Sequence, residues 1–341
     1  MGASLQNKKR LGWLDFGKAM GILIVLLVHA ECRLGLLTYY GGMFYMPIFF
    51  MAAGYTYRCK PQESFCEFVK KKSKRMLFPY AGTSLFLWFF FWIKDCILAG
   101  NPMDAKLHSI KGILYSRNQM YVAGYAGENP VLLDILNAPL WFLTAMFLAY
   151  LWYELASRSG RKYILLAVGL ILSVIWHYTA DLLLPWSLDA VPYFACFMAV
   201  GEFLRDKEII PHLVGKWYRF LLPLLIFIGL AHWNGSVNLS CGMYGRSMLI
   251  YLLVGSLSSL LVFAAGEVLE NFCAPVMKLT GWIGQETMTI LCFHMFLFMF
   301  IKTAANILGL GGGFTKFCLV AGSAAVLCIV GRCYHCILDK R

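Results

Sequence analysis

The chain is poor in charged residues. Only 14% of its 341 residues are Asp, Glu, Lys or Arg, whereas 60% are hydrophobic. A soluble domain carries about a quarter charged residues, and so few charges could not cover the water-facing surface of a globule of this size. The apolar residues also come in runs of about 18 to 22, the length of a helix that crosses a bilayer. These features predict an integral membrane protein.

Three other features are missing. The 12 cysteines show no repeated pair pattern, and the single CxxC, from Cys333 to Cys336, supplies too few ligands for a zinc site, which needs four. We therefore predict no metal. No small-residue cleavage pattern follows the first apolar run, so we expect this run to stay as a helix. No internal repeat or low-complexity tract is found, and residues 1–341 are predicted to form one membrane-embedded domain.

The net charge of +12 would suggest a nucleic-acid partner in a soluble protein. Here the Lys and Arg residues cluster between apolar runs and fall in alternate connections, which is the pattern of cytoplasmic loops. We therefore expect no nucleic-acid partner and place both termini in the cytoplasm. The basic segments are Lys8–Arg10, Arg58–Arg75, Arg158–Lys162 and Arg205–Arg219.

The fold predicted is an all-α polytopic bundle of about ten transmembrane helices, in a multi-pass protein of the cell membrane. The longest connection, residues 99–138, is expected to pack as a cap on the outer side. The predicted spans are 13–30, 40–57, 78–98, 139–155, 163–178, 190–204, 217–233, 247–265, 283–301 and 315–331.

The first span carries three ionisable residues, Asp15, Lys18 and His29. Such residues inside a membrane are costly and usually face a bundle interior or a water-filled cavity. Lys18 and His29 are eleven residues apart, close to three helical turns, so they share one face about 16 Å apart along the axis. Asp15 and Lys18 are three residues apart and can pair. The alternative is an interfacial Lys18 that reaches the headgroups and a water-facing His29, but each of these explains only one residue.

The order of several short motifs resembles acyltransferase family 3, particularly its fucose-4-O-acetylase-like branch. The resemblance spans nearly the whole chain, and one residue departs from it, since Ala53 stands where the family has Ser. The matching positions are Asp15, Lys18 and His29; Met46, Pro47, Phe49, Phe50, Gly54 and Tyr55; Arg75, Leu77, Pro79 and Tyr80; Leu140 to Leu143; and Gly284, Thr287, Ile290 and His294.

The resemblance implies a membrane O-acyltransferase. It would move an acyl group, usually acetyl, from acyl-CoA to a hydroxyl of a carbohydrate or cell-envelope glycan. Acetyl-CoA would then be a co-substrate, and no tightly bound cofactor is expected. The identity of the acceptor and the oligomeric state are left open.

Acyl transfer to a hydroxyl needs a base near neutral pH, for which imidazole is suited. We expect His29 to be this base and His294 to be a second catalytic residue. Glu31, two residues beyond His29, could orient the imidazole if the helix ends there. A structural, hydrogen-bonding His294 is the alternative.

The two substrates have separate candidate residues. Lys18, oriented by Asp15, and Arg75 are expected to hold donor phosphates, while the other basic residues of residues 70–75 are expected only to set topology or contact lipid headgroups. Candidates for binding the acceptor are Trp141, Asn234 and Asn238.

Two other functions also fit an apolar chain with intramembrane charges. A transporter of a sugar-like or small anionic solute is one, since such charges mark transport paths, although the paired interrupted helices of many transporters are not evident. A membrane scaffold or sensor is the other, and it leaves the placement of Lys18 and His29 unexplained.

Overall fold

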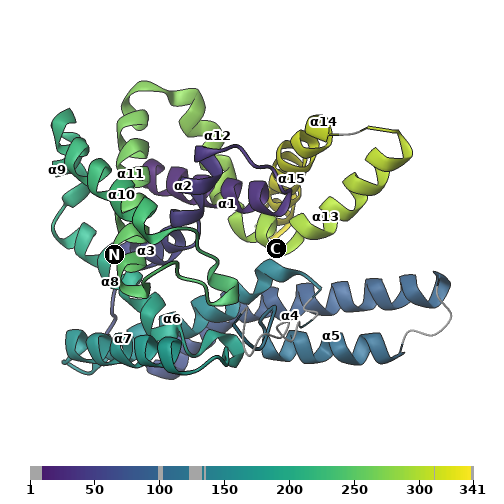
Figure 1. Ribbon diagram of the computed structural model, residues 1–341, viewed down its shortest axis with the longest axis horizontal. Helices are drawn as coiled ribbons and strands as arrows, with labels where there is room; N and C mark the ends of the chain where they lie inside the picture. The colour runs from purple at the N-terminus through teal and green to yellow at the C-terminus, as the bar shows by residue number, and fades with distance from the viewer. Residues whose placement is uncertain (1–9, 99–102, 123–132, 134–135, 311, 339–341) are drawn as a thin grey trace, which may run out of the picture.

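The computed structural model describes residues 10–98, 103–122, 133, 136–310 and 312–338. Within these ranges every extended regular element is a helix (Figure 1), and the only β pairings are two isolated bridges, Tyr121 with Leu182 and Asn238 with Met243. The predicted all-α fold class is therefore confirmed.

The described residues form fifteen α-helices. Their bounds are α1 Gly12–His29, α2 Leu36–Phe44, α3 Pro47–Thr56, α4 Phe65–Leu98, α5 Met103–Tyr115, α6 Trp141–Arg158, α7 Lys162–Thr179, α8 Val191–Asp206, α9 Ile209–Val214, α10 Leu221–Asn234, α11 Met248–Phe272, α12 Ala274–Gln285, α13 Thr287–Ile307, α14 Gly312–Phe317 and α15 Ser323–Leu338.

Each of the ten predicted apolar segments falls on helical structure. In the described part of the chain seven helices are long and apolar enough to cross a membrane, or eight if the bent pair α2 and α3 forms one span. α8 has 16 residues and α10 has 14, below the roughly 20 residues of a typical span. The count of ten and the cytoplasmic termini stay predictions, and residues 1–9 and 339–341 lie outside the described ranges.

The basic segment before the third predicted span is more helical than expected. α4 begins at Phe65 rather than near Phe78. A capping box starts it, in which the Ser64 amide donates to the Glu67 carboxylate (2.9 Å) and the Glu67 amide donates to the Ser64 hydroxyl (3.2 Å). The lysines that follow are good helix formers, so the positive charges of this connection are carried on a helical turn.

The second predicted span is broken into α2 and α3, which meet at an angle of 42°. Pro47 is the first residue of α3, and it lacks the backbone N–H that would continue the hydrogen bonding of α2. Irregular backbone at membrane depth is tolerated where it lines a cavity or is buried in protein. The bend at Tyr45 and Met46 meets this condition, because both residues line cavities described below.

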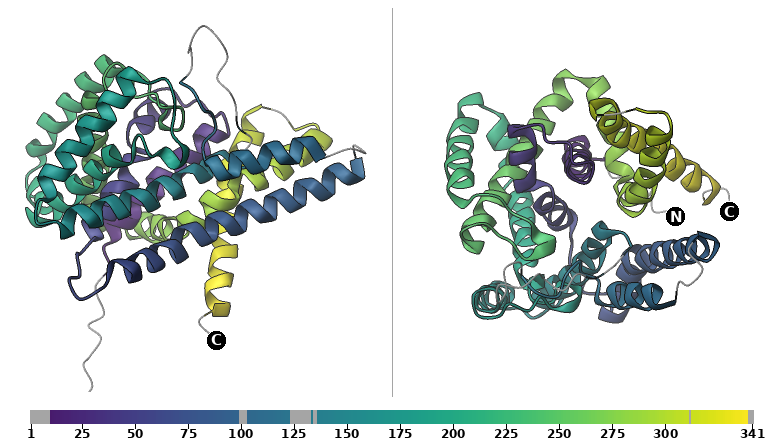
Figure 2. Two further views of the ribbon diagram at one scale, coloured as in Figure 1. Left: turned by 90° about the horizontal axis from the view of Figure 1, so that it is seen from below. Right: turned by 45° about the vertical axis from the view of Figure 1, so that its right-hand side comes forward.

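Helix α1 lies in the interior of the bundle. It packs against α2, α3, α11, α12 and α13, and the right-hand view of Figure 2 shows it in purple, nearly end-on, among the other helices. Residues such as Ala19, Ile22 and Leu26 are at most 1% exposed. A helix that is buried on most sides places its ionisable residues inside the protein rather than against lipid.

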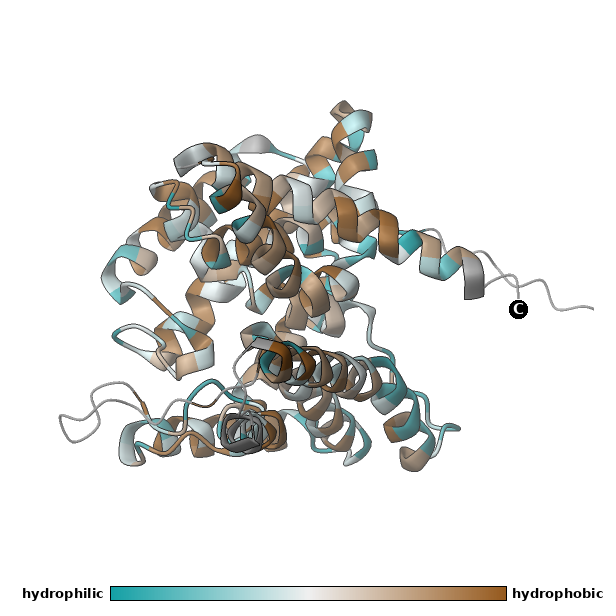
Figure 3. Cartoon of the chain, turned by 90° about the vertical axis from the view of Figure 1, so that its right-hand side faces the viewer, coloured by the Kyte–Doolittle hydropathy of each residue, from teal (hydrophilic) through white to brown (hydrophobic). Residues whose placement is uncertain are grey.

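The outward faces of the bundle are apolar. Ile164, Ile171 and Leu172 on α7 and Leu222 and Leu225 on α10 are all more than half exposed. In Figure 3 many helical turns are brown, whereas hydrophilic residues gather near helix ends and connections. Apolar faces of this extent suit lipid and would be a liability in water, so the structure supports a multi-pass membrane protein.

Glycine allows α3 and α8 to cross at backbone contact. A Cβ atom on Gly54 would overlap the backbone of Met198, and one on Gly201 would overlap the backbone of Met51. Small residues at such crossings let membrane helices approach closely. Gly54 belongs to the family-like motif of α3. The close crossing with α8 explains why a glycine is needed at this position.

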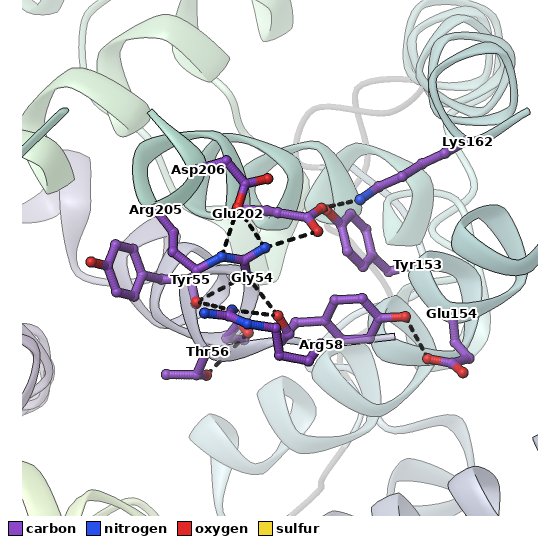
Figure 4. Close-up of polar contacts among 12 residues, drawn as sticks. Gly54, Tyr55, Thr56, Arg58, Tyr153, Glu154, Lys162, Glu202, Arg205 and Asp206 are labelled. Carbon is purple, nitrogen blue, oxygen red and sulfur yellow. Dashed lines mark hydrogen bonds and ion pairs between the residues drawn. The ribbon is translucent and has the colours of Figure 1, made fainter. Parts of the chain in front are cut away.

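The predicted cytoplasmic connections lie on one face of the molecule. Arg158 donates to the Glu63 carbonyl (2.6 Å), Arg205 donates to the Tyr57 carbonyl (2.6 Å), and Lys162 pairs with Glu202, as the close-up in Figure 4 partly shows. The start of α1 joins the same face, where the rings of Trp13 and Tyr55 are 4.8 Å apart. These contacts bring three of the basic segments together, and their cytoplasmic location stays a prediction.

That face is predicted to be cytoplasmic. Reporter fusions at Lys60 and at Ser236 should report opposite sides of the membrane, with Lys60 inside, because Lys and Arg are retained on the cytoplasmic side. A reporter that is active only outside the cytoplasm, paired with one that is active only inside, gives the measurement. The same side for both positions would contradict the predicted topology.

Candidate active site

The N-terminal end of α1, here called its inner end, carries a buried carboxylate between two basic side chains. The Asp15 side chain is 6% exposed and pairs with Arg10 and, at 2.5 Å, with Lys18, which keeps 25% exposure. The predicted pairing of Asp15 with Lys18 is thus present. Gly284 of α12 lies against the Asp15 carbonyl, where any Cβ would overlap it. α12 therefore packs closely on the turn of α1 that carries Asp15.

The other end of α1 meets α13 through two histidines. His29 is the last residue of α1 and is half-buried, and His294 is fully buried on α13. Their ring centres are 5.3 Å apart with an angle of 52° between the ring planes. Sequence reasoning proposed both residues, and the structure brings them together from positions 265 apart in the chain.

The contacts of His294 show which ring nitrogen carries the proton when the imidazole is neutral. Its Nδ1 lies 2.8 Å from the Ile290 carbonyl, which can only accept, so Nδ1 carries the proton and Nε2 has a free lone pair. Nε2 is buried with no hydrogen-bond partner in the described residues. A buried acceptor left without a partner is costly, and such groups occur where a protein prepares a site for proton transfer or for a ligand.

A first cavity, here called the inner cavity, has a volume of about 350 Å³ and begins at Lys18. Arg75 of α4 lines the same cavity, so the two residues expected to bind donor phosphates are brought together. Ala53 is also in its wall, and the hydroxyl that the family's Ser would supply there is missing. Much of the remaining wall is apolar, and it includes four methionines, Met46, Met76, Met146 and Met288.

A second cavity, the outer cavity, also has a volume of about 350 Å³ and contains His29. Met46 lines both the inner and the outer cavity, so the two adjoin at the bend between α2 and α3. The outer cavity has aromatic walls and several neutral polar groups. They are Tyr39, Tyr45 and Trp141, and His29, Thr38, Asn118, Ser236, Asn238 and Ser240.

A third cavity, the basic mouth, has a volume of about 340 Å³ and adjoins the inner cavity on the other side. Thr56, Arg75 and Tyr150 line both. The Lys72 ammonium lies 3.3 Å from the centre of the Tyr150 ring, a cation–π contact. The charged groups of the basic mouth are Arg58, Lys60, Lys71, Lys72 and Arg75, with Glu63 and Glu154.

A network of ion pairs and hydrogen bonds lies beside the basic mouth, at the C-terminal end of α3 (Figure 4). Arg205 donates to the carbonyls of Tyr55 (3.2 Å) and Tyr57 (2.6 Å), and its other side meets Glu202 at 3.2 Å. Arg58 donates to the same two carbonyls. Two cations thereby satisfy the free carbonyls at the end of α3, where positive charge also complements the helix dipole.

A buried ion pair holds the predicted cap over the outer cavity. Arg117 is 0% exposed, and its Nη1 contacts both Asp189 oxygens at 3.0 and 3.2 Å. Its Nε donates to the Ser187 hydroxyl (3.2 Å). Backbone bonds from Leu183 to Met120 (2.8 Å) join the same segments. The described part of residues 99–138 therefore packs against the connection between α7 and α8, as a cap would.

Strained backbone gathers around the outer cavity. Six residues other than glycine have positive φ in the described chain. Five of them follow His29 directly, belong to the cap, or lie in the connection between α7 and α8 against which the cap packs: Glu31, Ser116, Leu136, Trp186 and Ser187. Such conformations persist when surrounding contacts hold them, and they cluster at functional sites.

Two of the expected acceptor residues lie in the outer cavity and one does not. Trp141 and Asn238 line it. Asn234 is 1% exposed, and its amide is used within its own loop: Nδ2 donates to the Tyr244 carbonyl (2.8 Å) and Oδ1 accepts from the Ser247 amide (3.0 Å). The role indicated for Asn234 is therefore to shape the loop.

Glu31 is not joined to His29. Its side chain is exposed, its backbone is left-handed with φ of 53°, and no hydrogen bond links the two side chains in the described structure. α1 does end at His29, as was required if Glu31 were to orient the His29 imidazole. His294, rather than Glu31, is the polar group found beside the His29 ring.

Sequence reasoning missed Lys72, Tyr150 and Asn118. The run Ser-Arg-Asn-Gln at 116–119 is the longest uninterrupted polar stretch of the connection that contains it, and this signal could have drawn attention to Asn118. Lys72 was indistinguishable from its basic neighbours, because only the fold shows which lysine turns toward Tyr150.

Comparison with known families gives one match. The model of the acyltransferase 3 family, described as an acyltransferase domain, matches residues 11–333. The match is to the family as a whole and does not extend to the fucose-4-O-acetylase-like branch. No curated protein and no solved structure matches the chain.

The buried pair of the cap gives a prediction about stability. Burial raises the pKa of the Asp189 carboxyl, and Arg117 opposes this rise. Arg117→Met leaves the carboxylate buried without its partner and should cost about 3–5 kcal/mol of unfolding free energy at pH 8. A carboxyl whose pKa is higher in the folded protein stabilises it at low pH, and this contribution is lost as pH rises above about 4.

The loss caused by Arg117→Met should therefore be smaller at pH 5 than at pH 8, and thermal unfolding in detergent measures both. Arg117→Met with Asp189→Asn should recover part of the stability, and Arg33→Met, at an exposed position, is the matched control. An equal loss at the two pH values would show that Asp189 does not titrate in this range.

Proposed function

Since the family match covers nearly all of its length, the chain belongs to the acyltransferase 3 family and is a multi-pass membrane acyltransferase, and we propose that it transfers an acyl group, acetyl in the simplest case, from acyl-CoA to a carbohydrate hydroxyl. One observation carries this proposal. Three adjoining cavities run from a basic mouth, past Lys18, to His29, and the ring of buried His294 lies beside the His29 ring with 5.3 Å between the ring centres. The cell membrane is its proposed location.

The donor suits the basic mouth and the inner cavity. The phosphates of acyl-CoA need cations, and five line the basic mouth. Its pantetheine arm is narrow and uncharged, and suits a largely apolar passage such as the inner cavity. Lys18 and His29 are eleven helical residues apart, about 16 Å along the axis, a distance that the arm can cover. On this proposal Lys18 holds a phosphate at the near end of the inner cavity, oriented by Asp15, and the thioester lies beside His29.

The acceptor enters the outer cavity from the opposite side. His29 takes the proton of the attacking hydroxyl as its oxygen bonds to the thioester carbonyl carbon. The tetrahedral intermediate collapses, the carbon–sulfur bond breaks, and the proton on His29 passes to the departing CoA sulfur. The products are an ester and free CoA. No bound metal or resident cofactor takes part in these steps.

His294 is assigned to orienting His29. Its Nε2 lone pair can accept the N–H of one His29 ring nitrogen, which leaves the other nitrogen unprotonated toward the outer cavity. The Ile290 carbonyl supports this by keeping the proton of His294 on Nδ1. The transporter alternative leaves the family match unexplained, and covalent label transfer from radiolabelled acetyl-CoA separates the two functions.

His29→Ala should lower acyl transfer by about 10²- to 10⁴-fold, the usual contribution of a general base. Transfer of label from acetyl-CoA in purified membranes gives the rate, and thermal unfolding in detergent shows whether the fold is kept. His212→Ala, at an exposed histidine outside the three cavities, is the control. Activity of the His29 variant within a few-fold of the parent would rule out His29 as the base.

Lys18→Ala should raise the Michaelis constant for acetyl-CoA far more than that for the acceptor. Lys18→Arg should keep much of the activity, because phosphate binding needs positive charge and donors rather than a particular proton. Lys302→Ala, at an exposed position on α13, is the control. Steady-state kinetics with each substrate varied in turn provide the test, and an unchanged constant for acetyl-CoA would remove Lys18 from donor binding.

A further inference from the structure

Asn118 lines the outer cavity together with His29. Its Oδ1 is buried and has no hydrogen-bond partner among the described residues. Burying an amide oxygen without a partner costs free energy, so the fold accepts a penalty that a ligand donor would relieve. Oδ1 can only accept, and therefore calls for an O–H or N–H on whatever fills the cavity.

Hydrogen bonds and a buried ion pair hold the backbone around Asn118 in place. The Asn118 carbonyl accepts from the Leu133 amide (2.8 Å). On one side Arg117 is fully buried and paired with Asp189, and on the other Met120 bonds to Leu183 (2.8 Å). A group held in advance costs less entropy when a ligand binds.

The outer cavity is also uncharged. Among the described residues that line it, none is Asp, Glu, Lys or Arg. The nearest buried cation in sequence, Arg117, is already neutralised by Asp189 at 3.0 Å. A charged group placed in such a cavity would lose its hydration without gaining a partner. The part of the ligand that occupies the cavity is therefore neutral.

From these observations we infer that Asn118 binds the acceptor, and that the acceptor unit in the outer cavity is an uncharged polyol with at least two hydroxyls. This rests on the function proposed above. The attacking hydroxyl must give its proton to His29, so it cannot also donate to Asn118. A second hydroxyl of the same unit donates to Oδ1 and sets which hydroxyl faces His29. Asn118 is thus a specificity-determining residue for the acceptor.

The test uses the full-length protein in membranes of its native cells, which supply the acceptor whatever its identity. Each variant replaces the parent, and [¹⁴C]acetyl-CoA is the probe. Asn118→Leu, similar in size but without an accepting oxygen, should lower label transfer at saturating acetyl-CoA by about 5- to 10-fold, the effect of one hydrogen bond. The Michaelis constant for acetyl-CoA should stay within 2-fold of the parent's.

Asn118→Gln keeps a neutral amide oxygen and should retain clearly more transfer than Asn118→Leu. Asn306→Leu, at an exposed asparagine outside the three cavities, should behave as the parent. Equal transfer by the Gln and Leu variants, transfer by Asn118→Leu within 2-fold of the parent, or a parallel rise in the Michaelis constant for acetyl-CoA would each overturn the assignment of Asn118.

The labelled product tests the acceptor class. Mild hydrolysis of the labelled material and mass spectrometry should identify the acylated unit as a neutral polyol, such as an uncharged sugar. A uronic acid, a sugar with a free amine, or a unit with a single hydroxyl would overturn that part. If the parent itself transfers no label to any acceptor, the proposed function fails, and this inference fails with it.

Discussion

The structure depends on the cost of placing ionisable groups within a membrane. Asp15, Lys18 and His29 all belong to one apolar helix, and each would be costly against hydrocarbon. The fold meets this cost by surrounding α1 with other helices. Contact between α12 and the backbone of α1 at Gly284 shows how closely they pack. Two other helices add functional side chains at the two ends of α1. α4 places Arg75 in the same cavity as Lys18 at the inner end, and α13 places His294 beside His29 at the outer end.

The two ends of α1 are chemically unlike, and the break between α2 and α3 lies between them. A continuous helix there would have its backbone groups satisfied and its side chains evenly spaced. The bend before Pro47 instead places Met46 at the junction of the inner and outer cavities. Met46 therefore lies between a largely apolar cavity that contains Lys18 and Arg75 and an uncharged cavity that contains His29.

Local patterns in the sequence predicted the helices and the placement of Lys18 and His29, because helix periodicity and span length act over a few turns. The early start of α4 was missed although Ser64 and Glu67 carry the local signal for it. Contacts between distant segments could not be derived in this way. Arg117 and Asp189 are 72 residues apart, and nothing in either neighbourhood specifies the other. Asn234 illustrates the opposite error, since an amide in a polar loop suggests ligand binding until its partners in that same loop are known.

The methionines of the inner cavity also give its wall a chemistry that oxidation can change. Met46, Met76, Met146 and Met288 give this cavity flexible thioether walls, which adapt well to a moving substrate. Conversion of any one to the sulfoxide would place a polar oxygen in the apolar passage, and reductase enzymes could reverse the change.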